Sequence, residues 1–535
     1  MEFDYIIAGG GSAGSVLAAR LSEDPAVSVC LVEAGDTARD LLVRAPALVA
    51  AMVSGRPRLH NWALHTVPQA GLNGRRGFQP RGRGLGGSSA INAMLYIRGT
   101  PADYDGWADA GATGWDWASV RPWFLRAEGN IRGAGANHGA DGPLQVADQR
   151  HPRPITRAFI EAAGTCQIAP NDDFNGPVQD GAGLYQVTQF HSGPRKGERC
   201  SAAAAYLHPV MGRPNLTVLT RTRALRLVLD GRRATGLVVR GRGGETTLKA
   251  RREVILSLGA FGSPQLLLLS GIGPEDELRA HGIAPAHVLP GVGMNLQDHL
   301  DYTISHTSPR RDVVGLNPRG LMRLLKAGLR WRKTGEGLFA SPMAEGAAFL
   351  RSTPQEPQPD LQIHFVVGIV DQHMRKLHMA DGWSAHICAL RPFSRGTVGL
   401  TSANPLAPPR IDPAFLSDPR DLPLLMRAAR RLEEIIAAPA LAPWRGRRLY
   451  PHNGSDAALE ADIRARADTI YHPVGTCRMG QDDLAVTDPD LRVRGISGLR
   501  VVDASVMPRL IGGNTNAPTI MIAERAAALI RADRA

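Results

Sequence analysis

Cysteine is scarce in this chain, and its few cysteines follow no pattern. The chain of 535 residues contains Cys30, Cys166, Cys200, Cys388 and Cys477. An odd number of scattered cysteines without a C-x-x-C spacing argues for reduced thiols and against a disulfide framework or a zinc site. We therefore predict reduced thiols and no metal centre.

Long apolar runs and long basic blocks are also absent. No stretch reaches the roughly 20 apolar residues that a membrane-spanning helix needs. Lysine and arginine number 62 against 50 acidic residues, but they are spread along the chain, which argues against a nucleic-acid partner. A predicted strand begins at Asp4, which leaves no room for a signal peptide. These absences predict a cytoplasmic protein without a transmembrane segment.

The first thirty-six residues carry the clearest pattern in the chain. A short apolar run at 4–8 predicts a buried strand, and G-x-G-x-x-G follows it, before a predicted helix at 13–21 and a second strand at 27–32. Glu33 ends that strand, where an acid can hold ribose hydroxyls and would repel the 2′-phosphate of NADP. The pattern predicts a dinucleotide site but does not separate FAD from NAD. Its candidate contacts are Gly9, Gly11, Ser12, Ala13, Gly14, Glu33 and Ala34.

A second glycine-rich turn lies at 80–92, before a predicted apolar helix at 90–97. Such a turn exposes backbone N–H groups, and a helix N-terminus adds positive potential, so the segment favours an anion. Two such turns fit a cofactor with a long pyrophosphate and a ring system beyond it. The candidate contacts here are Gly84, Gly87, Ser88, Asn92 and Ala93.

The middle of the chain reads as strands with a few helices. Runs at 216–219, 225–229 and 236–240 predict a small β-meander, and a strand at 253–257 leads into a helix that starts near Ser263 and ends at Gly271. Further strands are predicted at 361–369, 384–390 and 397–401. A basic helix at 319–333 carries a leucine stripe (Leu321, Leu324, Leu325 and Leu329). It could lie on a membrane, and we favour the alternative that it covers the second domain.

The C-terminal stretches carry the candidate chemistry. His472 sits in a turn between Tyr471 and Pro473, and histidine has the unperturbed pKa that suits a base near neutrality. The segment 512–518 precedes a predicted helix at 519–530, whose N-terminus can stabilise negative charge. Asn514 or Thr515 is predicted to cap that helix, which leaves Asn516 free. Cys477 lacks a partner base, so we reject a nucleophilic role for it.

Five stretches together resemble the glucose–methanol–choline (GMC) oxidoreductase family of flavoproteins. They are 4–35, 86–92, 259–273, 471–480 and 499–518. The resemblance implies a mixed α/β fold: a Rossmann-like FAD-binding domain and a discontinuous substrate-binding domain on an antiparallel sheet. We expect 1–150, 200–298 and 455–535 in the FAD-binding domain, and 151–199 and 299–454 in the substrate-binding domain. The family's flavin contacts also match Asp503, Ala504, Asn514 and Thr515.

The same resemblance implies FAD-dependent oxidation of an alcohol to an aldehyde. It places the catalytic base at His472 and a second active-site group at Asn516. Electrons would then pass to a quinone-type carrier or to O2. Some relatives link FAD covalently through a histidine at the position of Ile91, so we expect non-covalent FAD here.

Alternatives stay open at this point. Choline would need an aromatic cage and an acid for its quaternary ammonium. Aromatic residues are only 5% of the chain and no cage can be identified, so we favour an uncharged primary alcohol over choline. A flavin-containing lyase or a photodecarboxylase could use the same fold. The decarboxylase would need a cysteine and an arginine from 361–369 or 384–391, and the first of these strands has no cysteine.

Overall fold

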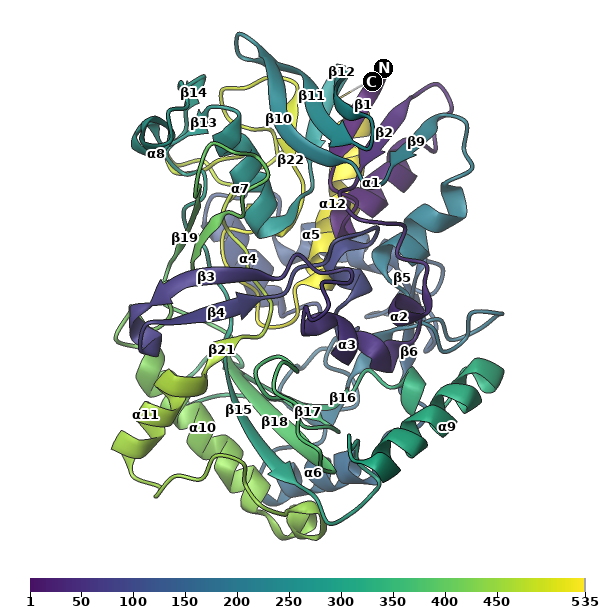
Figure 1. Ribbon diagram of the computed structural model, residues 1–535, viewed down its shortest axis with the longest axis vertical. Coiled ribbons are helices and arrows are strands. Elements are labelled where there is room, and N and C mark those ends of the chain that lie inside the picture. Colours follow the sequence, from purple (N-terminus) through teal and green to yellow (C-terminus); the bar gives the residue numbers. More distant parts are fainter. Residues whose placement is uncertain (534–535) are drawn as a thin grey trace.

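The computed structural model describes residues 1–533, and two sheets organise it (Figure 1). The first sheet is built around β1, which has a parallel neighbour on each side, β2 and β12. β9 extends the parallel sheet beyond β2, and β22 extends it beyond β12. The bounds are β1 Glu2–Ala8, β2 Val29–Val32, β9 Leu216–Leu219, β12 Gly244–Leu256 and β22 Leu499–Val501. The near-continuous burial of β1 and β2 follows from cover on both faces of a parallel sheet.

The predicted meander is partly wrong. β10 (Arg223–Asp230), β11 (Arg233–Gly241) and the first part of β12 form antiparallel pairs, as expected. The run at 216–219 does not join them, because it pairs in parallel with β2, Val29 opposite Leu216. A short apolar run does not by itself reveal which strand it will pair with, so the sequence could not make this distinction.

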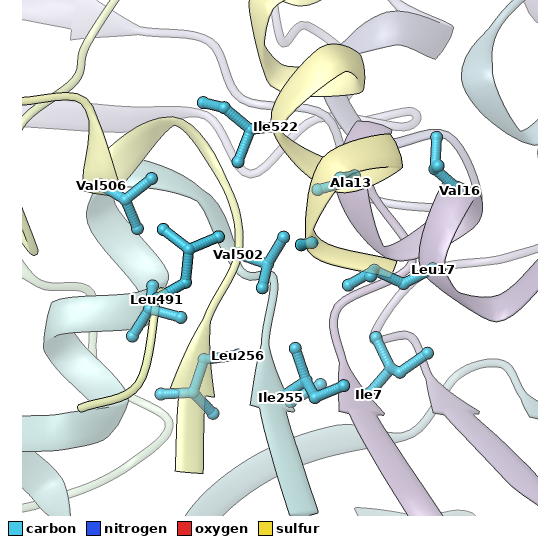
Figure 2. Close-up of a cluster of buried hydrophobic side chains, with 14 of the residues drawn as sticks. Ile7, Ala13, Val16, Leu17, Ile255, Leu256, Leu491, Val502, Val506 and Ile522 are labelled. Atoms are coloured by element: carbon cyan, nitrogen blue, oxygen red, sulfur yellow. The ribbon is translucent and has the colours of Figure 1, made fainter. Parts of the chain in front are cut away.

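Two helices from opposite ends of the chain pack together on this sheet. α1 (Ser12–Leu21) and α12 (Asn516–Ala532) run in the same direction. Hydrogen bonds join Ser12 to Asn516 near their N-termini and Arg20 to Glu524 further along. Leu17 of α1 and Ile522 of α12 belong to one hydrophobic core with Ile7 and Ile255 of the strands (Figure 2). Both helix N-termini therefore face the same end of the sheet.

The second sheet is antiparallel throughout, in the order β21-β15-β18-β17-β16-β7. Its strands are β7 Gly181–Leu184, β15 Leu300–Thr307, β16 Ala344–Leu350, β17 Leu361–Val366, β18 Gly382–Ala389 and β21 Asp468–Thr469. α6 (Pro154–Thr165) and α10 (Asp421–Ala437) contribute to one hydrophobic core with it. The mixed α/β class with an antiparallel second sheet is confirmed.

One segment lies elsewhere than expected. The sequence predicts residues 455–469 in the FAD-binding domain. β21 instead pairs with β15 of the second sheet, and α11 (Asp456–Arg466) buries Leu459 and Ile463 in that sheet's core. α11 is positioned by the packing of its apolar side chains. The sequence alone does not show whether these side chains pack against the first or the second sheet. The other domain boundaries stay a prediction.

Two predicted helices begin or form differently. Only a 3-10 turn, Gly87–Ala90, forms at the start of 90–97. Met94 has a positive φ of 64°, and the backbone around it pairs with β8 (Gln186–Thr188) instead of continuing as a helix. α7 (Gly259–Leu269) begins four residues before Ser263, and Gly271 lies just beyond its C-cap with φ of 78°. Both differences arise from contacts with distant segments.

The remaining elements connect or cover these sheets. The helices are α2 Leu41–Arg44, α3 Val49–Val53, α4 Pro101–Asp109, α5 Trp117–Ala127, α8 Glu275–Ala280 and α9 Pro318–Thr334. The strands are β3 Leu64–Gln69, β4 Arg75–Gln79, β5 Glu128–Asn130, β6 Leu144–Asp148, β8 Gln186–Thr188, β13 Ile272–Gly273, β14 His287–Val288, β19 Thr397–Gly399 and β20 Arg410–Asp412.

Two of the expected absences can be compared with the structure. Within residues 1–533, no helix combines the length and apolar character that a bilayer crossing requires. The five cysteines are all buried and none is in a disulfide.

The central strand β12 provides a test of the packing. Ile255 is fully buried between β1 and β22. Ile255→Ala should lower the free energy of unfolding by about 2–5 kcal/mol, because the cavity it leaves cannot fully collapse. A urea titration followed by circular dichroism measures the shift. Leu484→Ala, at a side chain that is 50% exposed, is the control and should change stability by no more than about 0.5 kcal/mol. Equal shifts for both variants would contradict this packing.

Candidate active site

A large cavity lies where the two sheets meet, with a volume of about 1240 Å³. One end is lined by the glycine turns of the first sheet, and the other by His364 of β17 and His386 of β18. Typical ligand pockets have about 300–1,000 Å³, so this cavity has room for a dinucleotide and a second small molecule. Of the predicted site residues, Gly14 and Gly84 do not line it. Those that do are Gly9, Gly11, Ser12, Ala13, Glu33, Ala34, Gly87, Ser88, Asn92, Ala93, His472, Asp503, Ala504, Asn514, Thr515 and Asn516.

The two glycine turns are shaped for a close approach of backbone. A Cβ on Gly14 would clash with the carbonyl oxygen of Gly9, so only glycine lets α1 begin directly at the end of β1. A Cβ on Gly87 would lie 2.7 Å from the Cα of Gly11, which places the second turn directly against the first. The N-termini of α1 and α12 point at the same space and add positive potential. This cradle fits the pyrophosphate of FAD.

Glu33 holds this cradle together. Its carboxylate accepts hydrogen bonds from the backbone N–H groups of Gly10 (2.9 Å), Gly35 (2.7 Å) and Gly84 (3.0 Å). Burial raises the pKa of Glu33, and the three N–H bonds oppose that rise. The residue therefore links both glycine turns to the end of β2, besides lining the cavity where a ribose is expected. Gly84 contributes through this bond rather than through the cavity wall.

Asp503 plays the same part on the other side of the cavity. Its carboxylate accepts from the backbone N–H of Gly259 (2.8 Å) and from the hydroxyl of Ser263 (2.6 Å), which fixes the first turn of α7. It also accepts from the hydroxyl of Ser505 at 2.6 Å. Burial raises the pKa of Asp503, and these bonds oppose the rise. The early start of α7 follows from this carboxylate, which lies 244 residues further along the chain.

His472 stands at the far end of the cavity, in a chain of hydrogen bonds. Its Nδ1 lies 3.0 Å from Nδ1 of His299, whose Nε2 lies 3.1 Å from the carbonyl oxygen of Leu390. A carbonyl only accepts, so His299 carries its proton on Nε2 and presents a lone pair at Nδ1. His472 therefore donates from Nδ1 and keeps its lone pair on Nε2, which is the atom a base needs.

The surroundings keep His472 neutral. Burial lowers the pKa of His472 well below its usual value, and the electrostatic influence of His299, His364 and Arg81 lowers it further. Burial also lowers the pKa of His299 to about 3. The backbone N–H of His472 donates to Asp298 at 2.9 Å, which fixes the turn. The imidazole is therefore neutral throughout the neutral pH range, with its one proton on Nδ1.

The structure corrects the identity of its partner. Asn514, not Asn516, contacts His472, with its side-chain Nδ2 at 3.1 Å from Nε2. The side chain of Asn516 instead accepts a hydrogen bond from the hydroxyl of Ser12 at 2.8 Å and ties α12 to α1. The expected cap is also absent, because α12 begins at Asn516 and Thr515 makes no side-chain bond at the N-cap position. Asn514 is thus free of the helix and turns into the cavity.

Three further polar residues join the site, Gln362 and His364 of β17 and Tyr185 directly after β7, and the sequence did not single them out. The side-chain Nε2 of Gln362 donates to Asn514 Oδ1 (3.1 Å) and to the hydroxyl of Tyr185 (2.9 Å). That hydroxyl lies 2.7 Å from Nδ1 of His364. Nε2 of His364 has no partner among the described residues, although it is buried and the ring lines the cavity. The alternation of apolar and polar residues along a strand does not reveal which polar side chains point into a site, so the sequence could not identify these residues.

The donor set of the site suits an organic cofactor rather than a metal ion. Within residues 1–533, no group of three or more histidine, cysteine, aspartate or glutamate side chains is placed to bind a metal. Glycine turns, converging helix N-termini and a buried acid are the groups that hold the pyrophosphate and ribose of a dinucleotide.

Comparisons with known proteins agree with this description. Two family models described as GMC oxidoreductase match residues 3–301 and 392–523. An alcohol dehydrogenase [acceptor] of Pseudomonas putida is 47% identical, covering 99% of this chain and 95% of its own. The mitochondrial choline dehydrogenase of Homo sapiens is 44% identical, covering 99% and 90%. Among solved structures, pyridoxine 4-oxidase from Mesorbium loti aligns with a TM-score of 0.88 at 35% identity, covering 99% of each chain.

The role of Glu33 leads to a test. Glu33→Ala leaves three buried N–H groups without an acceptor, at about 1–3 kcal/mol each. We expect FAD affinity to fall at least about tenfold, measured by flavin-fluorescence titration of the deflavinated protein. The rate of flavin reduction by an alcohol should be unchanged in protein that retains its flavin, because His472 lies at the other end of the cavity. Wild-type FAD affinity in the variant would contradict this assignment.

Proposed function

Because the chain belongs to the GMC oxidoreductase family, we propose a catalytic mechanism for the FAD-dependent oxidation of an alcohol. In this mechanism His472 is the base, and Asn514 donates a hydrogen bond to the alcohol oxygen. One observation carries the proposal. A neutral imidazole presents Nε2 to the cavity at 3.1 Å from an amide N–H₂ group, in the same cavity as the glycine cradle. One oxygen atom of a bound alcohol can reach both groups.

The residues of the chain divide the work as follows. The alcohol hydroxyl replaces the contact between His472 and Asn514, so that it donates to Nε2 and accepts from Nδ2 of Asn514. As the C–H bond breaks, Nε2 takes the hydroxyl proton, and the Asn514 amide stabilises the negative charge on the oxygen. The Nδ1–H of His472 donates to His299 throughout, which holds the ring in place.

FAD, when bound, supplies the acceptor for the hydride that leaves the carbinol carbon. The residues proposed to hold it are those of the cradle, with Gly9, Gly11 and Ser12 at the pyrophosphate and Glu33 at the ribose. Gly87, Ser88 and Asn92 of the second turn would lie along its length.

We propose an uncharged primary alcohol as the substrate class. Glu33 and Asp503 are the acidic residues lining the cavity, and each already accepts several hydrogen bonds. No lining carboxylate among the described residues is therefore left to pair with a quaternary ammonium ion, which weighs against choline. The lining also includes the apolar side chains of Val366, Ile369 and Val370, which suit an uncharged substrate. Because relatives at 44% identity are choline dehydrogenases, an alcohol panel that includes choline is the direct test.

A lyase or photodecarboxylase finds less support. The cysteine and arginine that a decarboxylase would need from the second sheet are Cys388 and Arg391, and neither lines the cavity. Arg391 forms an ion pair with Asp103 instead. Anaerobic flavin bleaching by an alcohol would exclude both alternatives.

Two classes of electron acceptor stay open, a quinone-type carrier and O2. The name of one relative, alcohol dehydrogenase [acceptor], favours a carrier. A cytoplasmic location stays a proposal, and the five free thiols support it because they suit a reducing compartment.

The paired roles of His472 and Asn514 define the main test. His472→Ala should slow anaerobic flavin reduction by about 10² to 10⁴, the usual contribution of a positioned base. Asn514→Ala should cost about 1–3 kcal/mol of transition-state stabilisation. The double variant should lose less than the sum, because both groups act on one oxygen. Stopped-flow absorbance with one good alcohol measures all three variants.

Asn516→Ala is the matched control. It removes an equal side chain two residues away, whose only described side-chain bond is to Ser12. It should leave the reduction rate within about threefold of wild type, well below the loss expected for a catalytic amide. If Asn516→Ala slows reduction more than Asn514→Ala does, the assignment is reversed. A fully flavin-loaded His472→Ala enzyme with wild-type rate would remove His472 from the mechanism.

Non-covalent binding of FAD is a separate proposal. Ile91 occupies the position where some relatives link the flavin, and an alkyl side chain cannot form that bond. Acid precipitation of the purified protein should release the yellow colour into the supernatant, where its absorbance is measured. Colour that stays in the pellet would show a covalent link through another residue.

A further inference from the structure

Helix α9 presents an apolar stripe to solvent. Leu321, Leu325 and Leu329 recur every four residues, and such positions lie on one helix face. These side chains are 49, 60 and 58% exposed, and Met322 beside them is 54% exposed. We call these four residues the α9 patch. A helix that only covered the second domain would turn its leucines inward, so the interpretation favoured from sequence does not account for this face.

The inner face of α9 is already fixed to the protein. Trp331 is buried and its indole N–H donates to the carbonyl oxygen of Gly197 at 2.9 Å. Leu324 lines the cavity, and the side chain of Asn317 accepts from the N–H of Gly320 at the helix start. The patch is thus the outer side of a firmly held helix, and Figure 1 shows α9 at the outer edge of the molecule.

The charge beside the patch is of one sign. α9 carries six basic residues and no acidic residue within Pro318–Thr334. Arg323 forms an ion pair with Asp381, and the other five basic residues form none with the residues that the structure describes. Lys326, Arg330 and Lys333 are exposed and follow one flank of the stripe. An exposed apolar stripe with a basic flank is the pattern of a helix that lies in a membrane interface.

The mouth of the cavity continues this surface. Leu377 lines the cavity and is 61% exposed, and Met379 near it is 66% exposed. The loop that carries them is tied to the start of α9, because Asp381 accepts a hydrogen bond from Asn317. Arg56 and Arg58 also line the cavity and are exposed. His65 and Arg76 line the same cavity, and the positive charge of Arg375, Arg58, Arg76 and Arg56 adds to burial in lowering the pKa of His65.

We propose that the α9 patch docks on an anionic phospholipid bilayer and holds the cavity mouth against the membrane surface. The basic flank matches anionic headgroups, whereas a second copy of this chain would bring like charges together. An apolar alcohol or a quinone-type carrier dissolved in the bilayer could then reach the cavity without crossing water. The docking itself does not depend on the proposed chemistry, and it can be measured without turnover.

The test uses flavin-loaded protein and vesicle sedimentation. Wild type should sediment with vesicles of phosphatidylcholine and phosphatidylglycerol, much less with phosphatidylcholine alone, and less as salt is raised. The triple variant Leu321→Gln, Leu325→Gln, Leu329→Gln should bind the anionic vesicles at least about tenfold more weakly. The matched control Val178→Thr, Val288→Thr, Leu484→Gln changes three apolar side chains exposed elsewhere and should bind as wild type does.

A second variant tests the charge alone. Lys326→Gln with Lys333→Gln should weaken binding to anionic vesicles by roughly fivefold for each charge removed. Neither variant alters a cavity-lining residue, so flavin reduction by a water-soluble alcohol should stay at the wild-type rate without vesicles. If the triple variant loses its flavin, the charge variant and Leu325→Gln alone decide the comparison.

Three results would overturn the proposal. One is a wild-type protein that fails to sediment with anionic vesicles at about 0.15 M salt. Another is a triple variant that sediments as wild type does. The third is a wild-type dimer in light scattering that the triple variant abolishes while no vesicles are bound, because the patch would then serve a second copy of the chain.

Discussion

The close contact between Gly14 and Gly9 is the constraint from which the site is built. Without a Cβ at position 14, α1 can start at the end of β1 and direct its N-terminus into the cavity. α12 then packs on α1 in the same direction, and the bond between Ser12 and Asn516 sets their relative height. That height decides which residue before α12 reaches His472. The contact between Gly9 and Gly14 thus helps to position the side-chain amide of Asn514, about 500 residues further along the chain.

The site also shows how burial and basicity are balanced. Removal of water lowers the pKa of His472, which makes the imidazolium costly and the neutral base available. A base that must take a proton then needs compensation at the moment of transfer. The Nδ1 lone pair of His299 supplies part of it, because the bond from His472 strengthens as positive charge develops on the ring. Leu390 fixes the tautomer that makes this possible, since its carbonyl can only accept.

Local patterns predicted those parts of the molecule that local chemistry decides. The strand, turn and helix at residues 2–21 follow from apolar runs and glycine spacing, and the antiparallel second sheet follows from the family resemblance. Predictions were wrong where a distant contact decides. A hydrogen bond to Asp503 lets α7 begin four residues earlier than predicted. Backbone pairing with β8 keeps residues 91–97 from forming a helix. β9 pairs with β2 and therefore does not join the predicted meander. None of these partners is near in sequence.

The choice between Asn514 and Asn516 illustrates the same limit at the active site. Both are asparagines in one turn, and either could cap a helix or face a ligand. The outcome depends on the residue at which α12 begins, and the helix begins at Asn516 because Ser12 holds that side chain from the other end of the chain. Asn514 then lies outside the helix. Gln362 donates a hydrogen bond to the amide oxygen of Asn514, which turns the amide nitrogen toward His472. The orientation of the proposed donor is therefore set by the second sheet, while its position is set by the first.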